Sequence, residues 1–187
     1  AICVLHAKRL LLVWAEPHWR PSHACGVFAF DDDYNFGVCS SRVHEVWARA
    51  NSSTLEDRLR YTPTTAFATF PFPQPSEIQR KRISNAAQRI AEIRRIACDS
   101  INAGLTKVYN LMDEGGFVEL KAAHRELDLA VADAYGWDAA MLDDPARLLD
   151  ALFDLNAKCA SDPNYRPFAS TSVQPSLLNL EENELDD

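Results

Sequence analysis

The sequence predicts an α+β fold, with a small mixed α/β N-terminal part followed by an α-helical bundle. Two observations support this fold class. Apolar, β-branched and aromatic residues fill two short runs near the N-terminus, residues 2–14 and 26–30, as is typical of strands. Beyond residue 76, apolar residues recur instead at the three- and four-residue spacing of amphipathic helices.

The connections and the helix of the N-terminal part follow from local composition. Residues 16–25 contain two prolines and residues 31–35 are mostly polar, so both segments are predicted to be loops or turns. Three valines and a tryptophan share one helical face over residues 37–50. This spacing predicts a single helix there.

The segment that follows is expected to form a hairpin and then a linker. Residues 55–61 and 65–70 are predicted to pair around Thr62-Pro63-Thr64. Residues 70–75 contain three prolines, which forbid a helix and favour an extended chain. We therefore expect a boundary at this point.

Three helices are predicted beyond the linker. The first begins with Ser76 as its N-cap and carries an apolar stripe as far as Gly104. The second spans roughly residues 117–135. The third spans roughly residues 145–158, behind the N-cap pattern Asp144-Pro145.

These elements divide the chain into three expected segments. Residues 1–75 form the mixed N-terminal unit, and residues 76–159 form a helical domain. Residues 160–187 lose the helical periodicity and end in an acidic run, so we expect a mobile tail.

Charge is distributed unevenly along the chain. The formal net charge is −8, but residues 1–75 are neutral overall, residues 76–97 carry +4 and residues 98–187 carry −12. Attraction for phosphate depends on the local field rather than on net charge. The acidic total therefore does not exclude contact between the first half and nucleic acid.

The cysteines and the hydropathy indicate a cytoplasmic protein. The five cysteines are widely spaced, odd in number and contain no Cys-x-x-Cys pair, which argues against a disulfide framework and a zinc site. Reduced thiols fit the cytoplasm. No apolar run approaches the roughly 20 residues that cross a bilayer. We expect no membrane partner.

Patterns associated with catalysis are few. Asp31-Asp32-Asp33 lacks the alternating ligands of a calcium loop and is interpreted as a solvated turn. Asp162-Pro163-Asn164-Tyr165 is similar to the base-amino motif of amino-methyltransferases, but its second proline is missing and no glycine-rich cofactor loop occurs in the chain. We expect no cofactor in this chain, and we do not expect it to be catalytic by itself.

Two segments carry residue types that suit nucleic acid. Residues 60–73 combine an arginine, a tyrosine and threonines with an aromatic run, as a surface that reads nucleic acid does, or as a β-turn packed on a core does. Arg42 and Arg49 lie seven residues apart on the predicted helix 37–50, with His44 nearby. This helix face is compatible with DNA contact and equally with solvent exposure.

The first long helix carries basic residues over much of its polar side: Arg80, Lys81, Arg82, Arg89, Arg94 and Arg95. They are compatible with phosphate contacts or with pairing to the acidic helices 117–158. We favour the pairing, because the acidic partner belongs to the same chain.

Four stretches occur in an order that matches a known family: Asp32 to Ala48, Arg60 to Pro73, Gly104 to Leu111 and Asp128 to Trp137. In this order they resemble the end of the target-recognition domain and the following helices of Type IIL (MmeI-like) restriction–modification enzymes and related adenine-specific DNA methyltransferases. The resemblance covers about residues 1–158. The family's endonuclease and methyltransferase domains lie upstream, so the resemblance implies the C-terminal piece of a larger protein.

The resemblance implies DNA target recognition within an S-adenosylmethionine-dependent adenine-N6 DNA methyltransferase, with cleavage by a separate domain in some members. The implied partners are double-stranded DNA and an upstream methyltransferase domain of the same polypeptide. Side chains just before the Phe-Pro-Phe-Pro stop help to read bases in this family. That role carries over to Arg58 and Arg60, together with Tyr61 and Thr62. The alternative, from another class, is a helical protein–protein interaction module without nucleic-acid binding.

Overall fold

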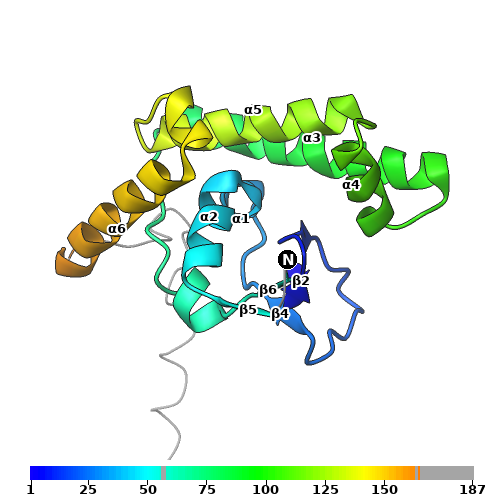
Figure 1. The fold of residues 1–187 in the computed structure, drawn as a ribbon, viewed down its shortest axis with the longest axis horizontal. Helices are drawn as coiled ribbons and strands as arrows, with labels where there is room; N and C mark the ends of the chain where they lie inside the picture. Colours follow the sequence, from blue (N-terminus) through cyan, green and yellow to red (C-terminus); the bar gives the residue numbers. More distant parts are fainter. Residues whose placement is uncertain (56–57, 163, 165–187) are drawn as a thin grey trace, which may run out of the picture.

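The computed structural model describes residues 1–55, 58–162 and 164. Two long helices, α3 (Glu77–Ile101) and α5 (Val118–Ala134), lie side by side along one side of the molecule (Figure 1). The shorter helices α1 (Asp33–Ser40) and α2 (Arg42–Ala50) lie between this pair and two small sheets. The predicted α+β fold class, with its helical bundle, is confirmed.

The strands form two three-stranded antiparallel sheets. The first sheet has the order β3-β1-β4, and the second has the order β2-β6-β5. The long strand predicted over residues 2–14 is divided into three short strands that belong to different sheets. The strand bounds are β1 Ile2–Val4, β2 His6–Ala7, β3 Leu12–Val13, β4 Cys25–Val27, β5 Ser53–Leu55 and β6 Arg58–Arg60.

The helix predicted over residues 37–50 is two helices. Ser41 adopts an extended backbone between them, and its side chain accepts from the His44 backbone N–H as the N-cap of α2. The polar turn predicted at residues 31–35 instead starts α1, because Asp32 accepts from the Asn35 backbone N–H and caps that helix.

The hairpin predicted between residues 55–61 and 65–70 is wrong. Strand β6 pairs with β5 on one side and with β2 on the other. The chain then enters a π-helical turn, η1 (Pro63–Phe67). Thr62 is held at its start, since the Thr62 backbone N–H donates to Ser52 Oγ at 3.2 Å.

The proline-rich run is extended, as predicted, and it packs against the core. The Phe70 and Phe72 side chains are only 3% and 2% exposed, and their rings lie edge-to-face at 4.9 Å. The hydroxyl of Tyr135 donates to the carbonyl of Pro71 at 2.8 Å, so the end of α5 also holds this segment.

In the helical part, two helices begin at the capping residues that the sequence predicted. Ser76 forms a reciprocal capping box with Gln79 at the start of α3, and Asp144 caps α6 (Pro145–Ser161). Helix α3 ends at Asn102, which adopts a left-handed backbone, rather than at Gly104. Helix α4 (Leu105–Asp113) was not predicted, and a short 3-10 helix, η2 (Ala139–Asp143), precedes α6.

One hydrophobic core runs through both halves of the described chain. Helices α1 and α3 approach closely at Gly37, where a Cβ atom would lie 2.8 Å from Ile83 Cγ2. The core therefore continues across residues 75 and 76, and the domain boundary placed there stays a prediction. None of the helices described is long and apolar enough to cross a membrane.

Candidate nucleic-acid interface

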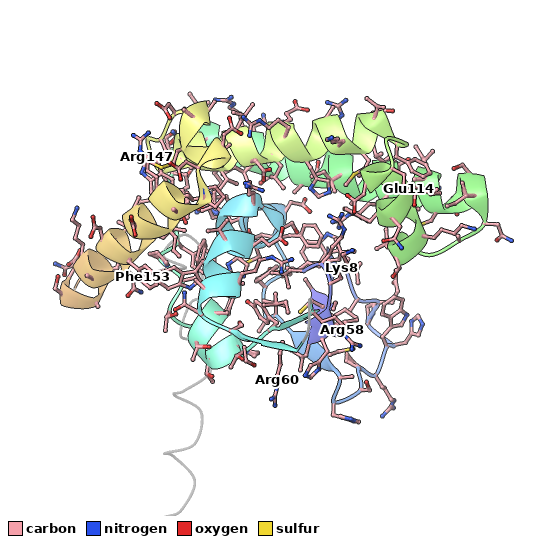
Figure 2. The ribbon with its side chains drawn as sticks, viewed as in Figure 1. Lys8, Arg58, Arg60, Glu114, Arg147 and Phe153 are labelled. Atoms are coloured by element: carbon pink, nitrogen blue, oxygen red, sulfur yellow. The ribbon has the colours of Figure 1, made fainter. Side chains whose placement is uncertain are left out.

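Strand β6 presents two arginines on the outer face of the second sheet. Successive strand residues point to opposite faces, so Leu59 enters the core at 2% exposure while Arg58 and Arg60 both point outward. Figure 2 shows both arginines at the sheet end of the molecule, away from α3 and α5. The guanidinium of Arg60 has no hydrogen-bond or ion-pair partner among the residues described.

Polar residues from the neighbouring strands extend this face. Arg60 lies directly opposite His6 of β2 and Ser53 of β5, and residues opposite each other in an antiparallel pair share a face. All three side chains are exposed. Lys8, which follows β2, is also exposed and lies near Arg58 in Figure 2. We call the residues His6, Lys8, Ser53, Arg58 and Arg60 the basic sheet face.

The sequence did not point to His6, Lys8 or Ser53. His6 and Lys8 join the two predicted arginines through pairing between strands about fifty residues apart, whereas Ser53 joins them through the neighbouring strand β5. No local pattern specifies the pairing of β2 with β6. The one available signal was Lys8 within an apolar run, which indicates a position where the chain returns to the surface.

His44 and Tyr61, predicted to contact DNA, lie in the core. Both side chains are buried, and His44 Nε2 lies 3.0 Å from the Tyr61 hydroxyl. Burial lowers the pKa of His44 to about 3 and raises the pKa of Tyr61, so both rings are neutral at pH 7. This placement argues against direct DNA contact by either ring, because the pair is buried and fastens α2 to the end of β6.

Thr62 is half-buried, and its hydroxyl forms a hydrogen bond within the chain. Its hydroxyl donates to the Arg60 carbonyl at 3.2 Å, which braces the end of β6 just below the exposed arginine. The Thr62 hydroxyl oxygen can still accept a hydrogen bond, but the bond that it donates stabilises this turn.

Arg42 joins the N-terminal part to the helical part. Its backbone N–H donates to Asp128 Oδ1 at 2.7 Å, and its Nε donates to the Leu142 carbonyl at 2.8 Å. Burial raises the pKa of Asp128 to about 6, even though the Arg42 N–H and nearby guanidinium groups lower it. Arg42 is exposed, but part of its guanidinium is used within the chain.

Arg49 sits at the edge of the basic sheet face. Its guanidinium donates to Glu45 at 2.7 and 3.0 Å and to the Lys8 carbonyl at 2.8 Å. Glu45 neutralises part of its charge, and the side chain remains 40% exposed. This contact ties the C-terminal turn of α2 to the strand that carries His6.

The arginines of α3 are largely used within the molecule. Arg82 pairs with Asp133 at 3.1 Å, and Arg89 pairs with Glu126 at 2.6 Å, which confirms the favoured pairing with the acidic α5 for these two residues. Arg95 pairs with Glu92 and Asp99 on its own helix. The side chain of Arg94 is buried and donates to the Tyr109 hydroxyl at 2.7 Å and to the Leu12 carbonyl at 2.9 Å.

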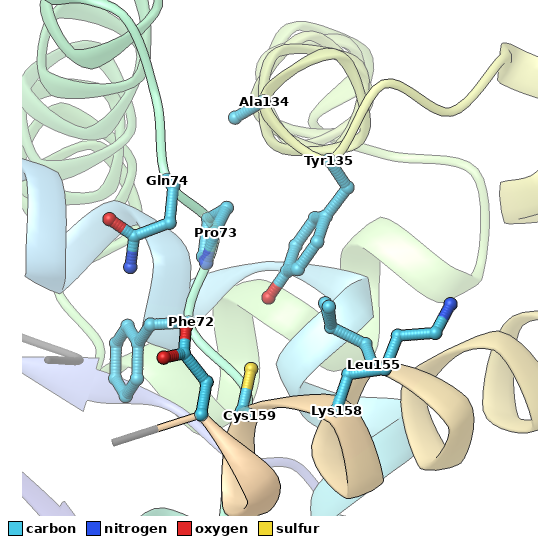
Figure 3. Close-up of a pocket in the computed structure, with 9 residues that line it drawn as sticks. Phe72, Pro73, Gln74, Ala134, Tyr135, Leu155, Lys158 and Cys159 are labelled. Carbon is cyan, nitrogen blue, oxygen red and sulfur yellow. The ribbon is translucent and has the colours of Figure 1, made fainter. Parts of the chain in front are cut away.

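A cavity of about 360 Å³ lies elsewhere, where the proline-rich run meets α5 and α6 (Figure 3). Phe72, Tyr135 and Leu155 give it apolar walls, and the charged residues Lys158 and Asp162 also line it. The described part of the chain holds no group of three or more histidine, cysteine or acidic residues that could bind a metal ion. Half of the Asp162–Tyr165 motif lies outside the described residues, namely Pro163 and Tyr165.

The chemistry of the basic sheet face is that of a donor surface. Arginine, lysine and hydroxyl groups face outward together, on a sheet whose underside is fixed by Leu59 and the His44–Tyr61 pair. Such groups donate hydrogen bonds to phosphate oxygens and to the acceptor edges of bases.

Two comparisons with known proteins identify similar molecules. Residues 13–74 match the family described as MmeI, target recognition domain. The fold is similar to that of the Type IIL restriction-modification enzyme MmeI, solved in complex with DNA, with a TM-score of 0.72 and 26% sequence identity over 86% of this chain. The chain spans 21% of the length of that enzyme's chain. No curated protein matches it. The resemblance found in the sequence is thereby confirmed.

Proposed function

We propose that this chain is the DNA target-recognition part of a Type IIL-like restriction–modification enzyme, and that the basic sheet face contacts double-stranded DNA. The observation that carries the proposal is the outward alternation of Arg58 and Arg60 about buried Leu59. The three residues lie inside the segment that matches the target-recognition family.

The geometry suits the major groove. The two arginines project from the central strand of a three-stranded sheet, and long side chains on such a surface can reach base edges in this groove. Arginine presents a fork of donors that fits guanine O6 and N7, so Arg58 and Arg60 are proposed to read bases. Lys8 and Arg49 lie at the edge of the face, where contact with the phosphate backbone positions the protein without reading sequence.

Arg42 is proposed for a phosphate contact only. Its Nε is used by the Leu142 carbonyl, so fewer donors remain to form a two-pronged contact with a base. We leave His44 and Tyr61 out of the proposed interface because both are buried. Thr62 contributes by shaping the turn behind Arg60.

The wider activity is also part of the proposal. An upstream domain of the same polypeptide would methylate adenine at N6 with S-adenosylmethionine in the cytoplasm, and a nuclease domain would accompany it in a restriction enzyme. We assign no residue of this chain to S-adenosylmethionine. The part played here is to orient the duplex so that the target adenine reaches the upstream domain.

The test is to map modified sites in the full-length enzyme that carries this chain. Arg58→Ala or Arg60→Ala should relax or switch one position of the recognised sequence, because a two-pronged arginine–guanine contact discriminates by about 1–3 kcal/mol. Arg42→Ala should weaken modification of all sites about equally. If both Arg58→Ala and Arg60→Ala leave the recognised sequence unchanged, the base-reading assignment is wrong.

The alternative is a protein-interaction module formed by the helices. One observation favours it: large apolar side chains are exposed on the helical part, among them Ile78 on α3, Val118 on α5 and Phe153 on α6. They are spread over three helices. Binding through such a surface would respond little to added salt, whereas phosphate binding weakens steeply.

A further inference from the structure

Trp19 is an exposed tryptophan on a loop whose end is hydrogen-bonded to Leu5, the residue between β1 and β2. The loop, residues 14–24, joins β3 to β4, and the Trp19 side chain is 47% exposed. The other three tryptophans are packed: Trp47 is buried, Trp14 stacks on Phe36 at 4.7 Å and Trp137 stacks on Tyr135 at 4.3 Å. Trp19 has no aromatic partner among the residues described.

The loop that carries Trp19 is ordered by its own hydrogen bonds. The Trp19 backbone N–H donates to the Glu16 carbonyl at 2.9 Å, and the Cys25 N–H donates to the Ser22 carbonyl at 3.0 Å. Pro17 and Pro21 restrict the backbone on either side of the tryptophan. A ring held outward on a constrained turn loses little conformational entropy when it binds a partner.

Leu5 fixes the position of this loop relative to the arginines. Its backbone N–H donates to the carbonyl of Ala24 at 2.9 Å, and its carbonyl accepts from the N–H of Tyr61 at 2.8 Å. Leu5 therefore lies between the end of the loop and the end of β6. In Figure 1 the loop leaves the molecule at the same end as β2, β4 and β6.

Arg20 gives the loop tip a charge suited to DNA. The residue next to the tryptophan is exposed, and it forms no ion pair or hydrogen bond within the described part of the chain. An exposed indole beside an exposed guanidinium combines an apolar surface for a sugar or base with a donor for a phosphate. Both lie inside the segment that matches the target-recognition family.

We propose that Trp19 and Arg20 form a second DNA contact beside the basic sheet face, in which the indole packs on a sugar or base edge and the guanidinium binds a phosphate. This inference rests on the proposed function. It adds a contact that depends on apolar packing, whereas the contacts of the basic sheet face are made by charged and polar donors.

The test measures binding of the 187-residue chain to a labelled duplex carrying the sites modified by the parent enzyme. Trp19→Ala should weaken binding about tenfold, the size of an aromatic contact to nucleic acid, and should leave the salt dependence unchanged. Trp19→Phe should keep affinity within about threefold, because an aromatic ring remains. Arg20→Ala should lower the slope of log affinity against log salt by about one unit.

Phe153→Ala is the matched control, because Phe153 is 45% exposed and lies on α6, far from the sheet end in Figure 2. It should bind DNA as the wild type does. Tryptophan emission gives a second readout: the change on adding DNA should be present in the wild type and lost in Trp19→Phe.

The outcomes separate the two proposals. If the wild type binds and Arg60→Ala weakens binding, while Trp19→Ala and Arg20→Ala leave affinity and salt slope unchanged, the loop contact is wrong and the basic sheet face stands. If the wild type binds no duplex, the proposed function and the loop contact are both wrong.

Discussion

At the scale of single residues, Phe70 anchors the packed proline-rich run. Its ring meets His44 edge-on at 4.6 Å and contacts Phe72, and the side chain is 3% exposed. Phe70→Ala should lower the free energy of unfolding by about 3–5 kcal/mol, because it removes a large buried ring and leaves a cavity. Urea unfolding followed by circular dichroism measures this.

The comparison variant for that measurement is Phe153→Ala. The Phe153 ring contacts Trp47 at 5.1 Å but is 45% exposed, so its removal should cost clearly less than that of Phe70. Equal losses in the two variants, or an unchanged midpoint for Phe70→Ala, would show that the Phe70 ring does not anchor the core.

The same residue scale shows what composition cannot decide. Arg60, Tyr61 and Thr62 were all predicted to face DNA, yet Arg60 points outward, Tyr61 points inward and Thr62 is half-buried. The alternation of a strand decides this, because residues 60 and 61 both lie within the predicted strand 55–61 and successive residues of a strand point to opposite faces. His44 looked equally suited to a surface, and only the packing of Tyr61 and Phe70 on it reveals its burial.

At the scale of elements, the contact between α1 and α3 depends on Gly37. A Cβ there would meet Ile83 Cγ2 at 2.8 Å and the Ala87 Cβ at 3.2 Å. Alanine favours a helix by about 1 kcal/mol over glycine, but overpacking costs about 1–3 kcal/mol. Gly37→Ala should therefore lower the thermal midpoint.

Gly104→Ala gives the matching substitution without the clash. No atom lies within 4 Å of the position of its added Cβ. The free energy of unfolding of Gly104→Ala should differ from that of the wild type by less than about 1 kcal/mol, the cost of replacing the glycine N-cap of α4 by alanine. A stabilised Gly37→Ala would contradict the close helix approach.

The junction of α2 with α5 makes stability depend on pH through Asp128. Its folded-state pKa of about 6 lies above the usual 3.8 because of burial, so the folded state binds the proton more tightly than the unfolded state does. Stability from this group is fully present below about pH 4 and is lost as pH rises through 6. His44, with a folded pKa of about 3, acts in the opposite direction.

Asp128→Asn isolates the contribution of the Asp128 carboxyl to the pH dependence of stability. The amide oxygen still accepts from the Arg42 N–H, and the histidines are unchanged. As pH rises from 4 to 6, the wild type should lose free energy of unfolding relative to Asp128→Asn. Denaturant unfolding at several pH values checks this, and a difference that does not vary with pH would contradict the raised pKa of Asp128.

Elements were predictable where the signal was local. Ser76 and Asp144 begin their helices as predicted, because an N-cap acts on backbone N–H groups within three residues. The pairing of β6 with β2 was not predictable, since it joins residues 6–7 to 59–60 and no local pattern encodes it. Helix α4 was missed because its nine residues are too few to display a clear periodicity.

At the scale of the whole molecule, acidic and basic side chains pair with one another on the long helices, apart from the basic sheet face. Helix α5 carries acidic residues that neutralise Arg82 and Arg89 of α3. The basic sheet face lies at the other side of the molecule (Figure 2) and keeps Arg60 without a partner among the described residues. The net charge of −8 therefore describes the helical part better than it describes the face proposed to meet DNA.

The most direct test of this account is the salt dependence of duplex binding by the 187-residue chain. Affinity should fall steeply and linearly on a log–log plot between about 50 and 200 mM salt, and Arg60→Ala should weaken binding and reduce the slope's magnitude, by up to about one unit if the lost contact is to phosphate. Lys81→Ala, on the polar side of α3, is the control and should match the wild type. Binding that is insensitive to salt, or that Arg60→Ala leaves unchanged, would contradict DNA recognition by the basic sheet face.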